Sequence, residues 1–267
     1  MSGFSITWLD LREDADQRAR DGALANKAIA ALAQTHAPQA PKLAVDLGAG
    51  TGSTLRALQK LGANDVVWRL VDHDGALLDE ALRRHRKEFV IEDHQCDLQI
   101  IDELPLAGAR LVTASALFDL CSKDFIHALC TKIGAQNTGL YAALNYDGST
   151  TWHPAHPFDE QVLAAFNQDQ QRDKGLGPAL GPNATSALKD ALESVGYSVE
   201  VTSSPWKLDS NDKALLQELI EGIRNAVADS LDHQALEQWV QFRLNNLDDC
   251  RCVVGHTDLL ALPNAQG

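Results

Sequence analysis

Residues 42–52 of the chain read KLAVDLGAGTG, an apolar run followed by three closely spaced glycines. The run at 42–47 is typical of a buried strand, and the residues directly after the glycines, 53–61, favour a helix. Glycine lets the backbone turn sharply and lets a ligand come close to main-chain atoms. Because open α/β sheets bind ligands at the carboxyl ends of their strands, this loop is the first candidate for a binding site.

The first half of the chain repeats this alternation of short apolar runs with helical segments. Such an alternation predicts a parallel sheet with helices on both faces. Upstream of the loop, one long helix is expected over 8–34, followed by a proline-containing break at 36–41. The further strands are expected at 65–72, 89–96, 109–115 and 139–145, and the helices between them at 76–88 and 123–133.

The second half is less regular, and its elements are expected to alternate with longer loops. A loop with two prolines is expected at 146–157, and a fixed turn region rich in glycine and proline at 172–182. Helices are expected at 158–171, 185–194, 211–229 and 234–245, and strands at 197–208 and 250–262.

Net charge and cysteine content limit the partners and the cell compartment that we expect for this protein. The 267 residues include 23 Lys and Arg against 37 Asp and Glu, a net charge of −14, which argues against nucleic acid and against an anionic membrane surface as partners. The five cysteines are odd in number and form no CxxC pair, so we expect reduced thiols in a cytoplasmic protein. The first twenty residues carry charges where a signal peptide needs an apolar stretch.

Two carboxylates fall at neighbouring strand ends. Asp72 ends the second expected strand, where a carboxylate can accept hydrogen bonds from two ribose hydroxyls, and Asp97 follows the third, where it can accept from an adenine amino group. The positions of these two carboxylates do not distinguish NAD, FAD and other adenosine ligands from one another. A dinucleotide fingerprint needs G-x-G-x-x-G, whereas here the third glycine is displaced to Gly52, and no P-loop ending follows.

The motif VDLGAGTG at 45–52, with Asp72 and Asp97 in the next two positions, resembles the class I S-adenosylmethionine-dependent methyltransferases. Residues 8–13, 115–120 and 173–182 also look like a group of bacterial enzymes of this class. The resemblance covers about residues 42–145 and implies a Rossmann-like seven-stranded sheet whose last strand is antiparallel. It implies S-adenosyl-L-methionine as cofactor, held by Arg12, Asp46, Gly48, Ala49, Gly50, Gly52, Asp72, His73, Cys96, Asp97, Leu98 and Ser115.

In the same reading, residues 1–41 form an N-terminal helical segment and residues 42–267 the methyltransferase domain. Two helical insertions, at about 146–182 and 209–249, are expected to cap the carboxyl edge of the sheet. The backbone of residues 48–52 would lie against the methionine part of the cofactor, with Ser115 near the methyl group. Arg12 would pair with the methionine carboxylate.

Candidate substrate and catalytic residues follow the fourth and fifth expected strands. Methyl transfer from a sulfonium is an in-line displacement, so alignment and exclusion of water are the main tasks, and a base is needed only when the nucleophile arrives protonated. Asp119 can serve as that base or can merely cap the helix that begins near Ser122. The candidates for catalysis are Asp119, Asp147 and His153, and those for substrate binding are Asn145, Tyr146, Trp152, His156, Arg172 and Lys174.

No metal site is expected, because His153 and His156 lie among prolines and no further ligand follows at a suitable spacing. The favoured function is methyl transfer to a small-molecule nucleophile. The alternatives are a noncatalytic protein that binds the same cofactor, a methyltransferase of RNA or protein, and a nicotinamide oxidoreductase.

Overall fold

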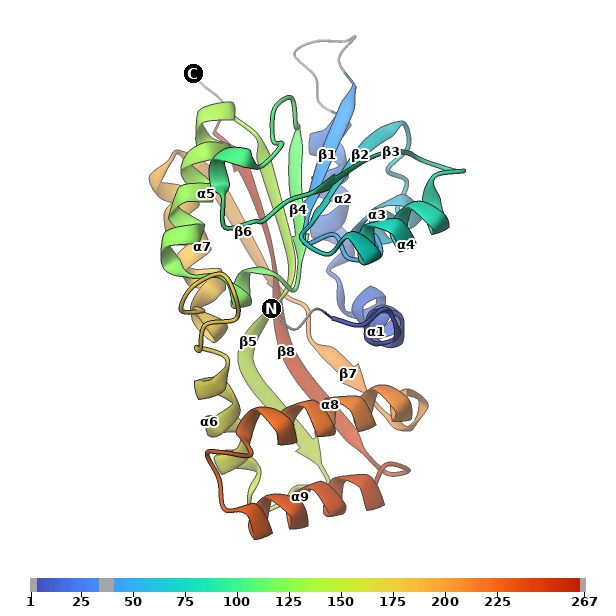
Figure 1. Ribbon diagram of the computed structural model, residues 1–267, viewed down its shortest axis with the longest axis vertical. Helices are drawn as coiled ribbons and strands as arrows, with labels where there is room; N and C mark the ends of the chain where they lie inside the picture. Colours follow the sequence, from blue (N-terminus) through green and yellow to red (C-terminus); the bar gives the residue numbers. More distant parts are fainter. Residues whose placement is uncertain (1–3, 34–40, 265–267) are drawn as a thin grey trace.

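The computed structural model describes residues 4–33 and 41–264, which form a mixed sheet with helices on both faces (Figure 1). The strand order is β3-β2-β1-β4-β5-β8-β6, and the short β7 also pairs with β8. The first five strands are parallel, whereas β8 runs antiparallel to both β5 and β6. This order confirms the expected sheet with its antiparallel last strand. The strands are β1 (Lys42–Leu47), β2 (Val66–Asp72), β3 (Val90–Gln95), β4 (Leu111–Ser115), β5 (Gly139–His153), β6 (Tyr197–Ser203), β7 (Trp206–Leu208) and β8 (Arg251–Pro263).

The helices cover the two faces of the sheet through two separate core clusters. Leu140 of β5 packs on the side of α5 and α7, and the next residue, Tyr141, packs on the side of α2, α3 and α4. Alternate residues of one strand thus enter opposite cores, as expected for a sheet covered on both faces. The α-helices are α1 (Ile6–Ala19), α2 (Gly22–Ala33), α3 (Ser53–Lys60), α4 (Gly75–His85), α5 (Lys123–Gln136), α6 (Asp159–Asp169), α7 (Ala184–Ser194), α8 (Lys213–Val227) and α9 (His233–Asn245).

The prediction of one helix over 8–34 is wrong, because the chain bends between α1 and α2. Arg20 leaves the helical conformation with ψ of 135°, and the Asp21 carboxylate accepts the backbone N–H of Leu24 at 2.7 Å. Asp21 therefore begins a second helix with its own capping contact. Residue 34 and most of the expected break at 36–41 lie outside the described residues.

The prediction of a loop over 146–157 is also wrong in its first half. Strand β5 continues to His153 and pairs with β8, with Thr150 opposite Val254 and His153 opposite Arg251. The residues of this extension alternate between exposed and partly buried, so the segment lacks the apolar run of a strand covered on both faces. The first expected insertion therefore begins with a strand, and its only α-helix is α6. The strand expected at 197–208 is likewise divided into β6 and β7.

The extended ends of β5 and β8 carry a third core cluster below the main sheet (Figure 1). Helices α8 and α9 contribute Leu216 and Trp239 to it, and α6 contributes Val162. Segments from both expected insertions thus pack on the same pair of strands. No helix in the described ranges is long and apolar enough to cross a membrane.

Candidate functional site

The glycine loop links β1 to α3 with three residues in the left-handed conformation. Gly48, Gly50 and Gly52 have φ of 63°, 53° and 85°, which side chains other than glycine rarely adopt. Ala49 donates its backbone N–H to Val71 at 3.1 Å, and Gly50 donates to the Asp72 carboxylate at 2.9 Å. The end of β2 therefore holds the loop in place.

Asp72 is 5% exposed and organises the end of β2. One carboxylate oxygen accepts from Gly50, and the other accepts the backbone N–H of Asp74 at 3.0 Å and lies 3.2 Å from Nδ1 of the half-buried His73. A carboxylate oxygen can accept two hydrogen bonds. The oxygen that accepts from Gly50 therefore keeps capacity for a hydroxyl.

A surface pocket of about 510 Å³ opens beside Asp72, at the ends of β2 and β3. Asp97 is exposed there, and its carboxylate accepts the backbone N–H of Gln99 at 2.9 Å. Gln99 in turn donates to the carbonyl of Gly175 at 2.5 Å, so the glycine- and proline-rich segment reaches the pocket. The lining residues are His73, Gln95, Cys96, Asp97, Gln99 and Gly175. Of the residues predicted here, Leu98 lies instead in the core.

The inner end of the site lies between the ends of β1 and β4, and the sequence analysis missed its main cation. Arg20 donates to the hydroxyl of Ser115 at 2.8 Å, but its Nε and Nη1 are buried without a partner among the described residues. Asp46, close to Arg20, accepts from Thr113 at 2.6 Å through one oxygen and leaves the other unpaired. Burial raises the pKa of Asp46 to about 6, opposed by the Thr113 hydroxyl, the Arg20 guanidinium and the nearby Thr54 hydroxyl.

Unpaired buried groups of opposite charge are complementary to an amino acid zwitterion. An unpaired guanidinium N–H donates a charged hydrogen bond to a carboxylate, and an unpaired carboxylate oxygen accepts from an ammonium. Nothing in the local sequence distinguishes Arg20 from Arg12 and Arg18 of α1. Its location follows from the bend between α1 and α2.

Arg12 is paired with a carboxylate of its own helix. Its guanidinium makes two hydrogen bonds to Asp16, at 2.9 and 3.1 Å, and lies 5.0 Å from the ring centre of Trp206. Trp206 also donates its indole N–H to Asp16 at 2.9 Å. The role predicted for Arg12 toward a cofactor carboxylate is therefore better suited to Arg20.

Asp119 lies just after β4 and does not cap α5. Ser122 performs that task by accepting the backbone N–H of Phe125 at 3.2 Å. Asp119 is 7% exposed, and its Oδ1 has no partner in the described part of the chain. Burial raises its pKa to about 6, against smaller opposing effects of its own backbone N–H, the Arg12 guanidinium and the Tyr146 N–H.

Two further buried side chains with an unpaired polar atom lie on the neighbouring strands. Asn145 is fully buried and donates through Nδ2 to the carbonyl of Thr257 at 3.3 Å, while its Oδ1 stays unpaired. His256 is 6% exposed, and its Nδ1 is unpaired within residues 4–33 and 41–264. Burial, with the nearby Arg12 guanidinium, lowers the pKa of His256 to about 3, so the imidazole is neutral.

The strand ends beside these groups carry backbone strain. Ala116 follows β4 with φ of 50°, and Leu144 precedes Asn145 with φ of 57°. Left-handed conformations cost free energy in residues with a side chain, and they cluster at binding and active sites. Their position at the ends of β4 and β5 agrees with a site at this edge of the sheet.

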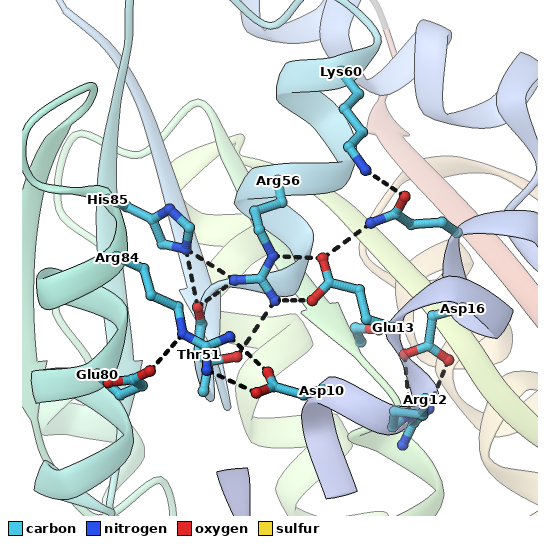
Figure 2. A network of polar contacts seen from close by, with 12 residues as sticks. Asp10, Arg12, Glu13, Asp16, Thr51, Arg56, Lys60, Glu80, Arg84 and His85 are labelled. Atoms are coloured by element: carbon cyan, nitrogen blue, oxygen red, sulfur yellow. Dashed lines mark hydrogen bonds and ion pairs between the residues drawn. The ribbon is translucent and has the colours of Figure 1, made fainter. Parts of the chain in front are cut away.

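Helix α1 lies over the glycine loop and is tied to α3 and α4 by ion pairs (Figure 2). Glu13 pairs with Arg56 at 2.5 Å, and Asp10 pairs with Arg84 at 2.6 Å. Arg56 also donates to the carbonyl of Thr51 within the loop at 2.6 Å. Leu9 lies so close that its Cδ1 would be 3.2 Å from a Cβ on Gly50. Helix α1 therefore shields the loop from solvent.

Several predicted residues lie away from this site. Asp147 is exposed, and its carboxylate accepts from the backbone and hydroxyl of Ser149 at 2.8 and 2.6 Å. His153 is exposed eight residues beyond Asn145, about 26 Å along an extended strand. Trp152, its neighbour, packs against Trp239 with ring centres 5.9 Å apart.

The other predicted substrate residues make local contacts. His156 accepts the backbone N–H of Phe158 through Nδ1 at 3.1 Å, which orders the turn before α6. Arg172 and Lys174 both pair with Asp169, at 3.4 and 2.5 Å. Tyr146 is nearer the site: its hydroxyl donates to Asn167 at 2.9 Å. Its ring centre is 6.3 Å from that of His256.

In the described ranges, no group of three or more His, Cys, Asp or Glu side chains is arranged to hold a metal ion.

Comparison with known proteins gives distant likenesses. No family model and no curated protein matches the chain. A phosphoethanolamine N-methyltransferase from Haemonchus contortus is 16% identical with a TM-score of 0.43, and the match covers 90% of this chain and 53% of that one. A cyclopropane synthase from Mycobacterium tuberculosis is 12% identical with a TM-score of 0.48, over 88% and 83% of the two chains. A putative methyltransferase from Bacillus halodurans is 13% identical with a TM-score of 0.49, over 88% and 99%.

The chain thus spans about half the length of the Haemonchus enzyme that it matches. Because all three identities are at most 16% and all three TM-scores are below 0.5, we base the function on the residues of this chain.

Proposed function

We propose that this protein is an S-adenosyl-L-methionine-dependent methyltransferase that acts on a small molecule. The observation that carries the proposal is the order of polar groups along one edge of the sheet. An open pocket with Asp97 comes first, then Asp72 beside the glycine loop, and finally the unpaired Arg20 and Asp46. These groups match the adenine, ribose and methionine parts of the cofactor in the same order.

Each part of the cofactor has a chemically suited partner in this chain. Asp72 accepts from the ribose hydroxyls, and the pocket with His73 and Asp97 takes the adenine ring. An unpaired N–H of Arg20, on Nε or Nη1, donates to the carboxylate, and Asp46 accepts from the ammonium through its unpaired oxygen. A pyrophosphate would instead place its charge beside the carboxylates of Asp46 and Asp72, which disfavours a dinucleotide.

The bound cofactor supplies a methyl group that is already activated on a sulfonium. The residues of this chain align the acceptor and exclude water. Leu9 and Leu117 close over the glycine loop, since a Cβ on Gly50 or Gly48 would meet them at 3.2 and 3.3 Å. Alignment of this kind lowers a barrier by roughly 7–11 kcal/mol. In this proposal Asp119, which is 7% exposed and has an unpaired Oδ1, takes a proton from the acceptor.

The site is covered by other parts of the protein, which favours a small substrate over a large one. Helix α1 lies over the loop, and Asp119 and Asn145 are at most 7% exposed, so a folded macromolecule cannot reach them. The net charge of −14 also disfavours RNA. We place the enzyme in the cytoplasm, since its five cysteines are free and four of them are buried. In this proposal residues 1–41 are an N-terminal helical segment whose helix α1 covers a methyltransferase domain formed by 42–267.

Calorimetry with S-adenosylhomocysteine tests the proposal. We expect one site per chain, and Gly50→Val should abolish binding because valine is strained at φ of 53° and meets Leu9. Gly222→Val is the matched control, since a Cβ there meets no atom within 4 Å. Binding of NADH in place of S-adenosylhomocysteine would contradict the proposal. Transfer of labelled methyl to amines, thiols, phenols or carboxylates then separates an enzyme from a noncatalytic binder.

A further inference from the structure

Asp258 of β8 is a fully buried carboxylate that connects three separate parts of the chain. Its Oδ1 accepts the backbone N–H of Leu144 at 2.8 Å and the Ser204 hydroxyl at 2.6 Å. Its Oδ2 accepts the backbone N–H of Asp21 at 2.9 Å and the Tyr141 hydroxyl at 3.3 Å. A carboxylate is costly to bury unless its oxygens are hydrogen-bonded, and here each oxygen accepts twice. This side chain therefore ties β5 to the bend between α1 and α2.

Asp258 lies opposite a bulge near the site end of β5. The register between β5 and β8 shifts here, so that two residues, Ala143 and Leu144, lie opposite Asp258. A bulge leaves part of the backbone outside the ladder of hydrogen bonds. Leu144, with φ of 57°, donates its N–H to the Asp258 carboxylate instead of to the neighbouring strand. The bulge thus gives this carboxylate a fixed position on β5.

The contact between Asp258 and Asp21 lies directly beside Arg20 in the chain. Because Oδ2 of Asp258 accepts the Asp21 N–H, it fixes the backbone from which the Arg20 side chain leaves. The far end of that side chain donates through Nη2 to the Ser115 hydroxyl at 2.8 Å. Arg20 is therefore held at both ends, while its Nε and Nη1 have no hydrogen-bond partner among the described residues.

The Tyr141 hydroxyl lies close to both Asp258 and the Arg20 guanidinium. Burial, with the nearby Asp258, raises the pKa of Tyr141 above its usual range, so the hydroxyl keeps its proton. Because that proton is donated to Asp258, the hydroxyl oxygen can offer only lone pairs to the guanidinium. Burial opposes the charge of Arg20, but Tyr141, Asp16 and Asp258 outweigh it and raise the pKa of Arg20. The surroundings thus keep this arginine charged.

We propose that Asp258 and Tyr141 are positioning residues that orient Arg20 toward the carboxylate of the bound cofactor. This inference rests on the proposed function, and in it neither residue touches the cofactor. Asp258 holds the backbone beside Arg20, and the Tyr141 hydroxyl lies close to the guanidinium. A side chain that is ordered in advance loses less conformational freedom on binding. The effect of both residues therefore passes through Arg20 and is limited to ligands that carry the amino acid group.

A double-mutant cycle, measured by calorimetry on the full-length protein, tests this assignment. Tyr141→Phe removes only the hydroxyl and should weaken S-adenosylhomocysteine about fivefold. Methylthioadenosine, which lacks the amino acid group, should change less than twofold. In the Arg20→Ala background, Tyr141→Phe should change the affinity for S-adenosylhomocysteine less than twofold, because the residue through which Tyr141 acts is gone. Asp258→Asn turns one acceptor oxygen into a donor and should show the same pattern as Tyr141→Phe.

Tyr197→Phe is the matched control for the loss of a buried hydroxyl. The Tyr197 hydroxyl donates to the carbonyls of Ile133 and Thr138, at 3.1 and 2.9 Å, so its removal should leave both affinities within twofold. The positioning assignment is overturned, with the proposed function left standing, by any of three results for Tyr141→Phe: no loss, an equal loss for the two ligands, or a loss that persists in the Arg20→Ala background. An unmodified protein that binds neither ligand contradicts the proposed function itself.

Discussion

The two ends of the site differ in how their polar groups are satisfied. At the end proposed to bind adenosine, Asp72 accepts from two backbone N–H groups, and Asp97 accepts from a third. At the end proposed to bind the methyl acceptor, Oδ1 of the buried Asp119 has no partner within the described ranges. The carboxylates of the first end are held by backbone N–H groups, whereas the second end keeps an unpaired buried oxygen.

This difference suggests that one end of the site is built for binding and the other for the reaction. A preorganised end is suited to a common cofactor, because its loop and carboxylates are held by contacts within short local motifs. An end with unpaired acceptors lowers the stability of the fold and is retained where it recognises a substrate. Mutations at the two ends should therefore have opposite effects on stability and different effects on binding.

The largest expected effect is at the preorganised end. Asp72→Ala removes the ribose acceptor and the partner of Gly50, so the affinity for S-adenosylhomocysteine should fall at least several hundredfold in calorimetry, about 3–4 kcal/mol. Asp97→Ala, on the exposed side of the pocket, should cost less than tenfold. Equal losses in the two variants would show that Asp72 has no special role.

At the acceptor end, Asp119→Asn should stabilise the protein. Burial raises the pKa of Asp119 from 3.8 to about 6, so the native state holds this proton more tightly than the unfolded chain. The cost of the ionised group is therefore complete above pH 6 and absent below about pH 4. We expect a gain of up to about 3 kcal/mol in the free energy of unfolding at pH 8 and none at pH 4, measured with urea. A gain that is independent of pH would contradict this.

Arg20→Ala tests the part of the site proposed to bind the methionine group of the cofactor. The affinity for S-adenosylhomocysteine should fall about thirtyfold, or about 2 kcal/mol, because a charged hydrogen-bond donor is lost. Methylthioadenosine, which lacks the amino acid group, should bind within threefold of its original affinity. Arg18→Ala is the matched control, since Arg18 lies two residues before Arg20, in α1, but is 52% exposed and pairs with Asp212. A loss that is the same for both ligands would remove Arg20 from carboxylate binding.

The smallest expected effect concerns the ion pairs of α1. Glu13→Gln breaks the ion pair between Glu13 and Arg56, in which the two side chains are 18% and 16% exposed. The free energy of unfolding should fall by about 1 kcal/mol. Glu200→Gln breaks a pair with Lys27 in which both side chains are more than half exposed, and should change stability by less than about 0.5 kcal/mol. If urea unfolding gives equal values, the Glu13 pair does not hold α1 on the loop.

Much of the fold was predictable because its signals are local. Short apolar runs, the glycine loop and Gly196, with φ of 89° after α7, each act over a few residues. The extension of β5 escaped prediction because one side of it faces solvent, so Thr151 and His153 resemble loop residues. His153 was therefore placed near the reaction, whereas the strand carries it far away.

The sequence by itself determined the end proposed to bind adenosine, since Asp72 and the loop 48–52 are a strand-end carboxylate and a compact motif that adjacent parallel strands bring together. Only the tertiary structure decided the acceptor end. Arg20 meets Ser115 across 95 positions, and Tyr146 meets His256 only because β8 returns beside β5. Whether a buried polar atom is paired depends on every segment packed around it, and no local pattern of residues specifies that.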